Sequence, residues 1–221
     1  MKQEIFSPDG GPKTIRGTLL EAPTRFAFIL PSRGNLAGLP TFEGDSTDVN
    51  VVVESSRSST VRYGYNAAID VFEMSCILPA GSRFPLDIGF IPSTLAEDGH
   101  PLNILVFTDA PACVGCVVAA RPIGVIEAEQ TLDGETFRSD RLIGVATGSC
   151  KFADMESIDD LNPRILDEIE RFLVSYDRMS RRLFNPLGRA GRDAAVELVR
   201  EAMGEYTNSY LPNLARASRG R

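Results

Sequence analysis

Short apolar segments alternate with polar punctuation over the first two thirds of the chain. Segments rich in Val, Ile and Tyr occupy residues 25–30, 50–54, 60–66, 103–108, 116–127 and 141–147. Each is bounded by Gly, Pro, Ser or Asp, which is typical of strands in an antiparallel sheet or a small barrel. The segments lie too close together for crossover helices, which parallel strands require. This part of the chain therefore predicts a compact antiparallel β-structure.

The last third of the chain has a helical period instead. Asn162 is a suitable N-cap, and Pro163 stands at the first helical position, where proline is tolerated. The apolar positions that follow are three and four residues apart, which predicts one helix of about five turns with an apolar stripe. They are Ile165, Leu166, Ile169, Phe172, Leu173, Tyr176 and Met179.

A break at residues 186–188, Pro-Leu-Gly, separates this helix from a second one predicted from about Asp193 to Met203. Strands followed by helices indicate an α+β fold class. We expect a flexible N-terminal arm over 1–24, one folded domain over 25–205 and a polar C-terminal tail over 206–221. Residues 32–48, rich in Gly, Ser and Thr, are expected to form a long loop.

Composition narrows the classes of function. A chain of 221 residues with 43% hydrophobic content can bury one sizeable core. The net charge of −7 argues against a nucleic-acid partner, which usually requires a basic surface. The sequence has no apolar run of about 18 residues and no apolar leader, so we expect no membrane partner and a cytoplasmic location.

The four cysteines leave several interpretations open. Cys113 and Cys116 have the C-x-x-C spacing of a redox pair or of half a zinc site. Cys76 and Cys150 stand alone, and the only histidine is His100, whereas a structural zinc site usually has a second close pair. Four reduced thiols that fill small positions are the remaining alternative.

Several segments, taken in order, resemble the soluble family I inorganic pyrophosphatases. They are Gly89-Phe-Ile-Pro-Ser-Thr-Leu95, Asp98-Gly-His-Pro-Leu-Asn103, Arg121-Pro-Ile-Gly-Val125, Arg141-Leu-Ile-Gly-Val-Ala146, Ser157-Ile-Asp-Asp-Leu161, Arg62-Tyr63 and Pro85. The resemblance covers about 26–203. It implies a small OB-like antiparallel β-barrel of five strands flanked by C-terminal helices. It also implies a homo-oligomer and the metal-dependent hydrolysis of pyrophosphate with Mg²⁺.

The same resemblance assigns the candidate site residues. The family signature D-x-D-P-x-D becomes Asp98, His100 and Asn103 here. Arg62 and Arg141 replace lysines, and Tyr176 is kept, which makes these three the expected substrate-binding residues. The other family positions are substituted: Gln130 and Ser139 replace metal-binding aspartates, Asp177 a lysine, Phe84 and Ile88 tyrosines, Cys76 an arginine and Ile29 a glutamate.

These replacements bear on the chemistry because Mg²⁺ prefers carboxylate oxygens, and because phosphoryl transfer depends on positioning and charge neutralisation. Of five family aspartates, one remains. Each lost carboxylate removes an attraction of about 4 kcal/mol at about 4 Å and an effective dielectric of about 20, before desolvation is subtracted. We therefore expect hydrolysis to be lost or weak, and a phosphate-ligand-binding or structural role.

The main alternative is an active magnesium-dependent diphosphatase with a rearranged metal site. Its acids would come from one hairpin, at Glu127, Glu129, Asp133, Glu135 and Asp140. A one-residue shift on a strand points a side chain to the other face, so Asp140 could replace the acid lost at Ser139 only through a bulge or loop. A solvated acidic hairpin is the simpler interpretation.

Further alternatives concern the signature segment and the two arginines. Asp98, His100 and Asn103 could form one weak site better suited to zinc or manganese, or Asp98 could start a turn and leave His100 on the surface. His100 could also act as acid or base towards another phosphate ester. Arg62 and Arg141 could bind a phosphate anion or pair with the hairpin acids.

Overall fold

The structure is a computed structural model that describes residues 35–217, with side chains placed as far as residue 209. The predicted arm at 1–24 and the predicted strand at 25–30 lie outside the described residues. Within the described part, no helix is long and apolar enough to span a membrane.

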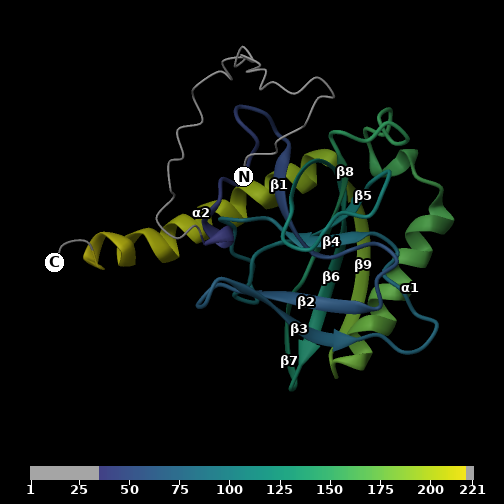
Figure 1. The fold of residues 1–221 in the computed structure, drawn as a ribbon, viewed down its shortest axis with the longest axis horizontal. Helices are drawn as coiled ribbons and strands as arrows, with labels where there is room; N and C mark the ends of the chain where they lie inside the picture. The colour runs from purple at the N-terminus through teal and green to yellow at the C-terminus, as the bar shows by residue number, and fades with distance from the viewer. Residues whose placement is uncertain (1–34, 218–221) are drawn as a thin grey trace, which may run out of the picture. The chain divides into compact units, whose positions relative to one another are not determined.

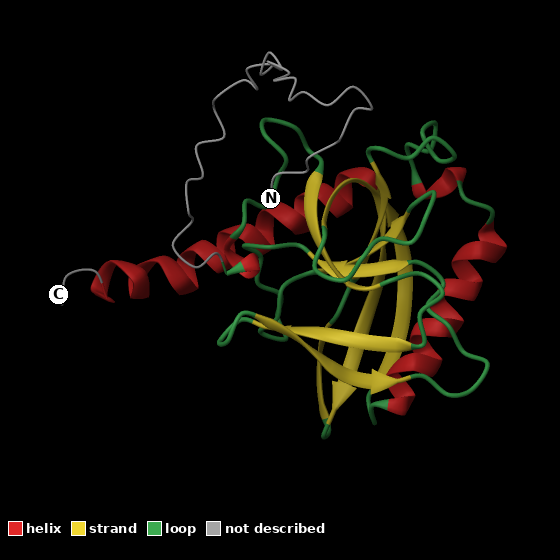
Figure 2. Cartoon of the chain, in the orientation of Figure 1, coloured by secondary structure: helices red, strands yellow, loops and turns green. Residues whose placement is uncertain are grey.

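Nine strands and two α-helices make up the described part (Figures 1 and 2). The strands are β1 (Val49–Ser55), β2 (Val61–Asn66), β3 (Val71–Ile77), β4 (Asp87–Phe90), β5 (Asn103–Phe107), β6 (Val117–Leu132), β7 (Glu135–Arg138), β8 (Arg141–Ala146) and β9 (Leu183–Gly191). The helices are α1 (Pro163–Met179) and α2 (Arg192–Ala217), with short 3₁₀ turns at Leu36–Gly38 and Ile158–Asp160.

Five strands close into a ring, which confirms the predicted small barrel. The pairing runs β1–β4–β5–β8–β6, and β6 pairs again with β1. Closure leaves these five strands without a free edge within the ring. Each of the predicted strands at 50–54, 60–66, 103–108, 116–127 and 141–147 coincides with a strand of the structure.

One pair in the ring is parallel, although the sequence predicted an antiparallel sheet. Asn103 of β5 lies beside Arg141 of β8, and the two strands run in the same direction. The other four pairs of the ring are antiparallel. A closed ring with an odd number of strands cannot alternate direction all the way round, so one parallel pair is required.

The second half of β6 extends beyond the ring and pairs with β7 and β9. The sequence did not predict β9, because Pro186 and Gly188 were interpreted only as helix breakers. Both residues do lie beyond the end of α1, but they are part of a strand and not of a loop. Proline is tolerated there because β9 pairs only with β6, and Pro186 stands next to a shift in the register. The β2–β3 hairpin forms a separate two-stranded sheet.

The two helices cover opposite faces of the strands. Along β5, Leu105 and Phe107 belong to the apolar cluster that contains the buried residues of α1, whereas Ile104 and Val106 belong to the cluster that contains those of α2. This division follows from the two-residue alternation of side chains along a strand. Both predicted helices are therefore confirmed as amphipathic elements of the core.

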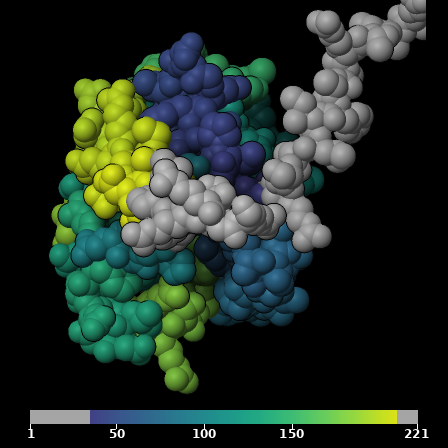
Figure 3. Space-filling model, turned by 90° about the vertical axis from the view of Figure 1, so that its left-hand side faces the viewer, coloured from purple at the N-terminus to yellow at the C-terminus, as the bar shows by residue number. Residues whose placement is uncertain are grey.

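The helix ends match the sequence signals in part. The side chain of Asn162 accepts a hydrogen bond from the Arg164 amide, so the predicted N-cap of α1 is confirmed. Helix α2 continues to Ala217, well beyond the predicted end near Met203. Residues 203–207 of this helix line a hollow together with residues 40–44, which precede β1; Figure 3 shows the yellow part of the chain next to the purple part.

Candidate functional site

Six of the residues predicted for the site lie together with Glu54 where β1, β2, β6, β8 and α1 meet. We call this group the arginine cluster. Its members are Glu54, Arg62, Gln130, Ser139, Arg141, Tyr176 and Asp177, and contacts between them or electrostatic interactions connect them. Four strands and one helix thus meet around two guanidinium groups and two carboxylates.

Arg62 is bound by a carboxylate from the neighbouring strand. Its Nη2 donates to Oε2 of Glu54 at 3.2 Å, and the other oxygen of Glu54 accepts from the Tyr65 amide at 3.1 Å. The guanidinium carbon of Arg62 lies 5.7 Å from the centroid of the Tyr176 ring. Burial is the largest single influence and disfavours the charge of Arg62, but the attractions of Glu54, Tyr176, Cys76 and Asp177 together outweigh it and raise the pKa of the guanidinium.

Arg141, at the start of β8, has no carboxylate among its described hydrogen-bond partners. Its Nη1 donates to the carbonyl and hydroxyl oxygens of Ser139 at 3.0 and 2.9 Å and to the Asp140 carbonyl at 3.1 Å. Burial lowers the pKa of this guanidinium, Asp177 opposes that shift, and the like charge of Arg62 adds to it. Arg141 is therefore the less neutralised of the two arginines.

Asp177 contributes a buried carboxylate to the same group. It is 4% exposed, and its Oδ2 accepts a hydrogen bond of 2.7 Å from Nε2 of Gln130, which is 1% exposed. Its negative charge acts on both Arg62 and Arg141. The sequence placed Asp177 next to the apolar stripe of the helix, but only the structure shows that it is buried.

Tyr176 is held as a neutral phenol. Burial is the main reason why its pKa rises to about 12; Arg62 opposes that shift, whereas Cys76, which forms a hydrogen bond with the phenol, adds to it. Cys76 is the cross-strand partner of Arg62 in the β2–β3 hairpin. The phenol can therefore donate a hydrogen bond, but it is not an ionised nucleophile near neutral pH.

One wall beside the arginine cluster is apolar. Phe84 and Ile88 are 1% and 5% exposed. The Phe84 ring lies 5.5 Å from the ring of Phe172 and 5.8 Å from that of Tyr176, centroid to centroid. Neither Phe84 nor Ile88 has a hydroxyl group that could reach a phosphate.

The signature segment forms a turn that Asp98 starts. Its Oδ1 accepts from the His100 amide at 2.9 Å, and the His100 side chain is exposed. This is the turn-forming role that the sequence allowed for Asp98. Asn103 pairs in register with Arg141, whose charge also interacts with Asp98. Whether Asp98, His100 and Asn103 bind a metal stays a prediction.

The acids of the β6–β7 hairpin are engaged by Arg138. This arginine donates to Asp140 at 2.7 Å and to Glu127 at 3.0 Å, and Asp140 also accepts from the Ala128 amide at 2.9 Å. Arg62 and Arg141 do not form salt bridges with these acids: Arg62 pairs with Glu54, and Arg141 contacts only the backbone carbonyl of Asp140.

The remaining hairpin acids lie nearer the tip. Asp133 and Glu135 are exposed on either side of the turn, and Glu129 is partly buried on β6. Across residues 35–209, no three His, Cys, Asp or Glu side chains stand close enough to share a metal ion. The carboxylates of the arginine cluster point to guanidinium and amide donors, so this set does not fit a cluster of divalent ions.

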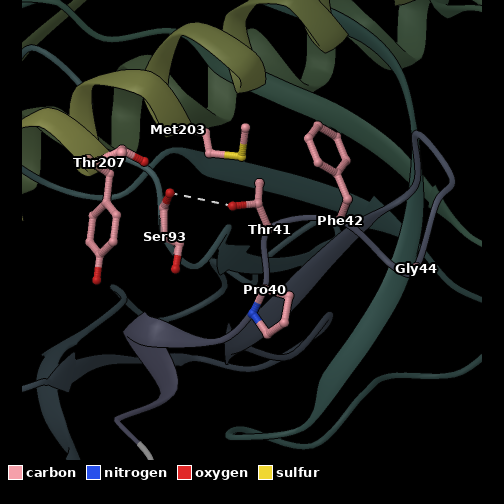
Figure 4. Close-up of a pocket in the computed structure, with 8 residues that line it drawn as sticks. Pro40, Thr41, Phe42, Gly44, Ser93, Met203 and Thr207 are labelled. Atoms are coloured by element: carbon pink, nitrogen blue, oxygen red, sulfur yellow. Dashed lines mark hydrogen bonds between the residues drawn. The ribbon is translucent and has the colours of Figure 1, made fainter. Parts of the chain in front are cut away.

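A separate hollow of about 410 Å³ lies between α2 and the segment before β1. Figure 4 shows its lining, with Thr41 donating a hydrogen bond to the Ser93 carbonyl. The lining residues are Pro40, Thr41, Phe42, Gly44, Ser93, Met203, Tyr206 and Thr207. None belongs to the arginine cluster, and the hollow has no charged side chain in its lining.

Comparison with known proteins settles the family. The sequence profile of the inorganic pyrophosphatases matches residues 51–207, well over half of the chain. The chain belongs to the inorganic pyrophosphatase family. Its barrel and its two helices are therefore those of a pyrophosphatase scaffold.

Relatives in sequence and structure agree with this assignment. The inorganic pyrophosphatases of Synechocystis and Nostoc are 35% and 33% identical over 158 residues, covering 72% of this chain and 91% of each relative. The crystal structure of the Thermus thermophilus inorganic pyrophosphatase superposes with a TM-score of 0.73 at 30% identity. That match covers 79% of this chain and 99% of the Thermus chain.

Sequence reasoning missed Glu54. It assigned the early family glutamate to Ile29, but the family match begins at residue 51, and Ile29 lies outside the described residues. Glu54 is the acid of β1, inside the match, and it binds Arg62. The signal was available: a single acid closes an otherwise apolar strand, Val51-Val-Val-Glu54.

Proposed function

We propose that this pyrophosphatase homologue binds a phosphate-bearing small molecule at the arginine cluster and that its hydrolysis of pyrophosphate is lost or weak. The observation that carries the proposal is the internal pairing of the cluster. Arg62 is paired with Glu54, and Asp177 accepts from Gln130 while its charge acts on Arg141. Two guanidinium groups and two carboxylates thus compensate one another without any bound cation.

Electrostatics supports the loss of hydrolysis. A diphosphatase site gathers divalent cations with several free carboxylates, because the cations neutralise the phosphates and activate water. In this cluster Gln130 and Ser139 carry no charge, and Arg141 brings a positive charge beside Ser139. A divalent cation placed there would meet amide and guanidinium N–H groups, which are donors and cannot act as ligands.

The two arginines support binding of a phosphate-bearing ligand. Guanidinium groups present paired N–H donors that match phosphate oxygens. Arg141 has no carboxylate among its described hydrogen-bond partners, and Tyr176 keeps its phenolic proton as a further donor. A phosphate at Arg62 would have to replace Glu54, so this salt bridge should reduce affinity.

The test combines phosphate binding with hydrolysis. Isothermal titration with inorganic phosphate and with pyrophosphate should show binding that Arg141→Gln weakens and Glu54→Gln strengthens. Glu170→Gln is the matched control, since Glu170 pairs with the α1-facing Arg189 and takes no part in the arginine cluster. Equal binding by the wild type and Arg141→Gln would refute the ligand assignment.

Hydrolysis is tested on the same samples with Mg²⁺ and with Mn²⁺. Release of phosphate at an ordinary enzymatic rate would overturn the proposed loss of activity. The active diphosphatase with a rearranged site remains the alternative, and it needs Glu127 and Asp140 to leave Arg138. A crystal soaked in Mn²⁺ would support it only if metal were bound by these hairpin acids or by Asp98.

The resemblance also implies a homo-oligomer and Mg²⁺ as cofactor, and the sequence pattern predicts a cytoplasmic location. These stay predictions for this chain. Light scattering at several protein concentrations checks the first, and a mass near that of one chain, 24.0 kDa, would contradict it.

A further inference from the structure

The C-x-x-C motif lies on a tight turn just before β6. The Cys116 amide donates to the Cys113 carbonyl at 3.1 Å, and Gly115 has a φ of +85°. A hydrogen bond between the first and fourth residues, with positive φ at the third, defines a β-turn whose end Cα atoms are less than about 7 Å apart. Cysteines joined by a disulfide bond have Cα atoms about 4.4–6.8 Å apart. The turn therefore brings Cys113 and Cys116 into the range of a disulfide.

The backbone around the turn is anchored on both sides. The Ala112 amide donates to Oδ2 of Asp87, a carboxylate that is 1% exposed. On the other side, the Gly115 amide donates to the Val53 carbonyl at 2.8 Å, and the Val53 amide donates to the Cys116 carbonyl at 3.0 Å. These bonds hold the two cysteines at a fixed separation in the reduced protein.

Both thiols are also accessible. Cys113 and Cys116 are exposed free cysteines. The zinc alternative finds no support in the described residues, because no third His, Cys, Asp or Glu completes a metal group with the pair. Cys150 is exposed on a different loop, and Cys76 is partly buried beside Tyr176. The pair therefore differs from the other two cysteines in having an adjacent thiol on the same turn.

We propose that Cys113 and Cys116 form a reversible intramolecular disulfide by exchange with a small-molecule disulfide of the glutathione type. In the first step one cysteine thiolate attacks a sulfur of oxidised glutathione, forms a mixed disulfide and releases one glutathione thiolate. The second cysteine then attacks the protein sulfur of the mixed disulfide and releases the second glutathione. The protein loses two electrons and two protons, and one glutathione disulfide is reduced to two thiols.

The bond would tighten a turn that is hydrogen-bonded to β1. Val53, which accepts from Gly115 and donates to Cys116, directly precedes Glu54 of the arginine cluster. Oxidation should therefore slow hydrogen exchange of the Val53 and Gly115 amides. The disulfide itself is independent of the proposed function, because its formation requires no ligand at Arg62 or Arg141.

Peptide mapping tests the proposal, because trypsin leaves Cys113 and Cys116 in one peptide and puts each of the other two cysteines in a peptide of its own. Cys113 and Cys116 fall in peptide 84–138, Cys150 in 142–151 and Cys76 in 63–83. After the reduced full-length chain is incubated with oxidised glutathione and remaining thiols are blocked, peptide 84–138 should lose two hydrogens and carry no glutathione. Cys150 should carry one glutathione and serves as the internal control for reagent access.

Two single variants identify the second step. Cys113→Ser and Cys116→Ser should each retain one glutathione on peptide 84–138, because no neighbouring thiol can release it. Reduced glutathione in excess should restore both thiols of the wild type. Glutathione on both cysteines of the wild type, unreacted Cys113 and Cys116 beside a modified Cys150, or a crosslink from either of them to Cys150 would each overturn the proposal.

Discussion

The buried bond between Gln130 and Asp177 offers a sharp test of the charge arrangement in the site. Gln130→Glu keeps the side-chain length and places an introduced carboxylate where Nε2 now lies, 2.7 Å from Oδ2 of Asp177. Both positions are almost fully buried. Two carboxylates centred about 4 Å apart repel by about 4 kcal/mol at an effective dielectric of about 20.

The pH sets how much of that repulsion appears in the free energy of unfolding. The folded variant can avoid the repulsion by binding one proton that the two carboxylates share. For a carboxyl with an unfolded pKa near 4, this costs about 4 kcal/mol at pH 7 and about 1.4 kcal/mol at pH 5. Because the folded pKa of the pair is raised, the stability is present at low pH and is lost as pH rises.

Urea unfolding at pH 5 and pH 7 measures the effect. We expect Gln130→Glu to lose up to about 4 kcal/mol of stability at pH 7 and less than half of that at pH 5. Gln130→Met is the control of similar length: it removes the hydrogen bond to Asp177 without adding a second carboxylate, so it should lose about 2 kcal/mol at pH 7, with a smaller difference between the two pH values than Gln130→Glu. A loss for Gln130→Glu that is equal at both pH values, or below about 1 kcal/mol at pH 7, would refute the reasoning.

Three further predictions concern the same scaffold. Glu54→Gln should lower the free energy of unfolding by about 2 kcal/mol in urea, because Arg62 loses a charged partner in a partly buried site; an unchanged midpoint would count against that pairing. In an absorbance titration of the tyrosines, Tyr176→Phe should remove a phenol that ionises at about 12. Loss of a phenol that ionises near 10 would contradict the burial assigned to Tyr176. Gly124→Ala should cost about 3 kcal/mol or more, since a Cβ there would lie 2.6 Å from Cβ of Ile158, whereas Gly191→Ala meets nothing within 4 Å and should differ little in thermal unfolding.

The sequence predicted the parts of the fold whose signal is local. The N-cap at Asn162, the apolar stripe of α1 and five of the strands follow from short-range patterns, and the structure confirms them. Strand β9 was missed because its sequence, Leu-Phe-Asn-Pro-Leu-Gly-Arg-Ala-Gly, does not alternate regularly between apolar and polar residues, although exposure alternates along the folded strand, and because Pro186 suggested a break. Its place depends on the long edge that β6 offers, which is a tertiary property.

The site shows the same division. The resemblance placed Arg62, Arg141 and Tyr176 at one location, and the structure brings them together. The resemblance could not show that Asp177 is buried against Gln130, or that Glu54 forms a salt bridge with Arg62. The Gln130–Asp177 contact joins residues 47 positions apart and depends on the packing of α1 against β6. The Glu54–Arg62 contact joins strands of two different sheets, so it depends on how the β2–β3 hairpin lies against β1. Only the contacts reveal that the cluster neutralises itself.

The central claim is that this arrangement does not support hydrolysis of pyrophosphate. The most direct measurement is phosphate release from pyrophosphate by the purified full-length chain, in saturating Mg²⁺ and separately in Mn²⁺, at pH 7 to 8. We expect turnover well below about 1 s⁻¹ with either metal. A turnover number in the ordinary enzymatic range, about 1 to 1,000 s⁻¹, that depended on the added metal would contradict the account.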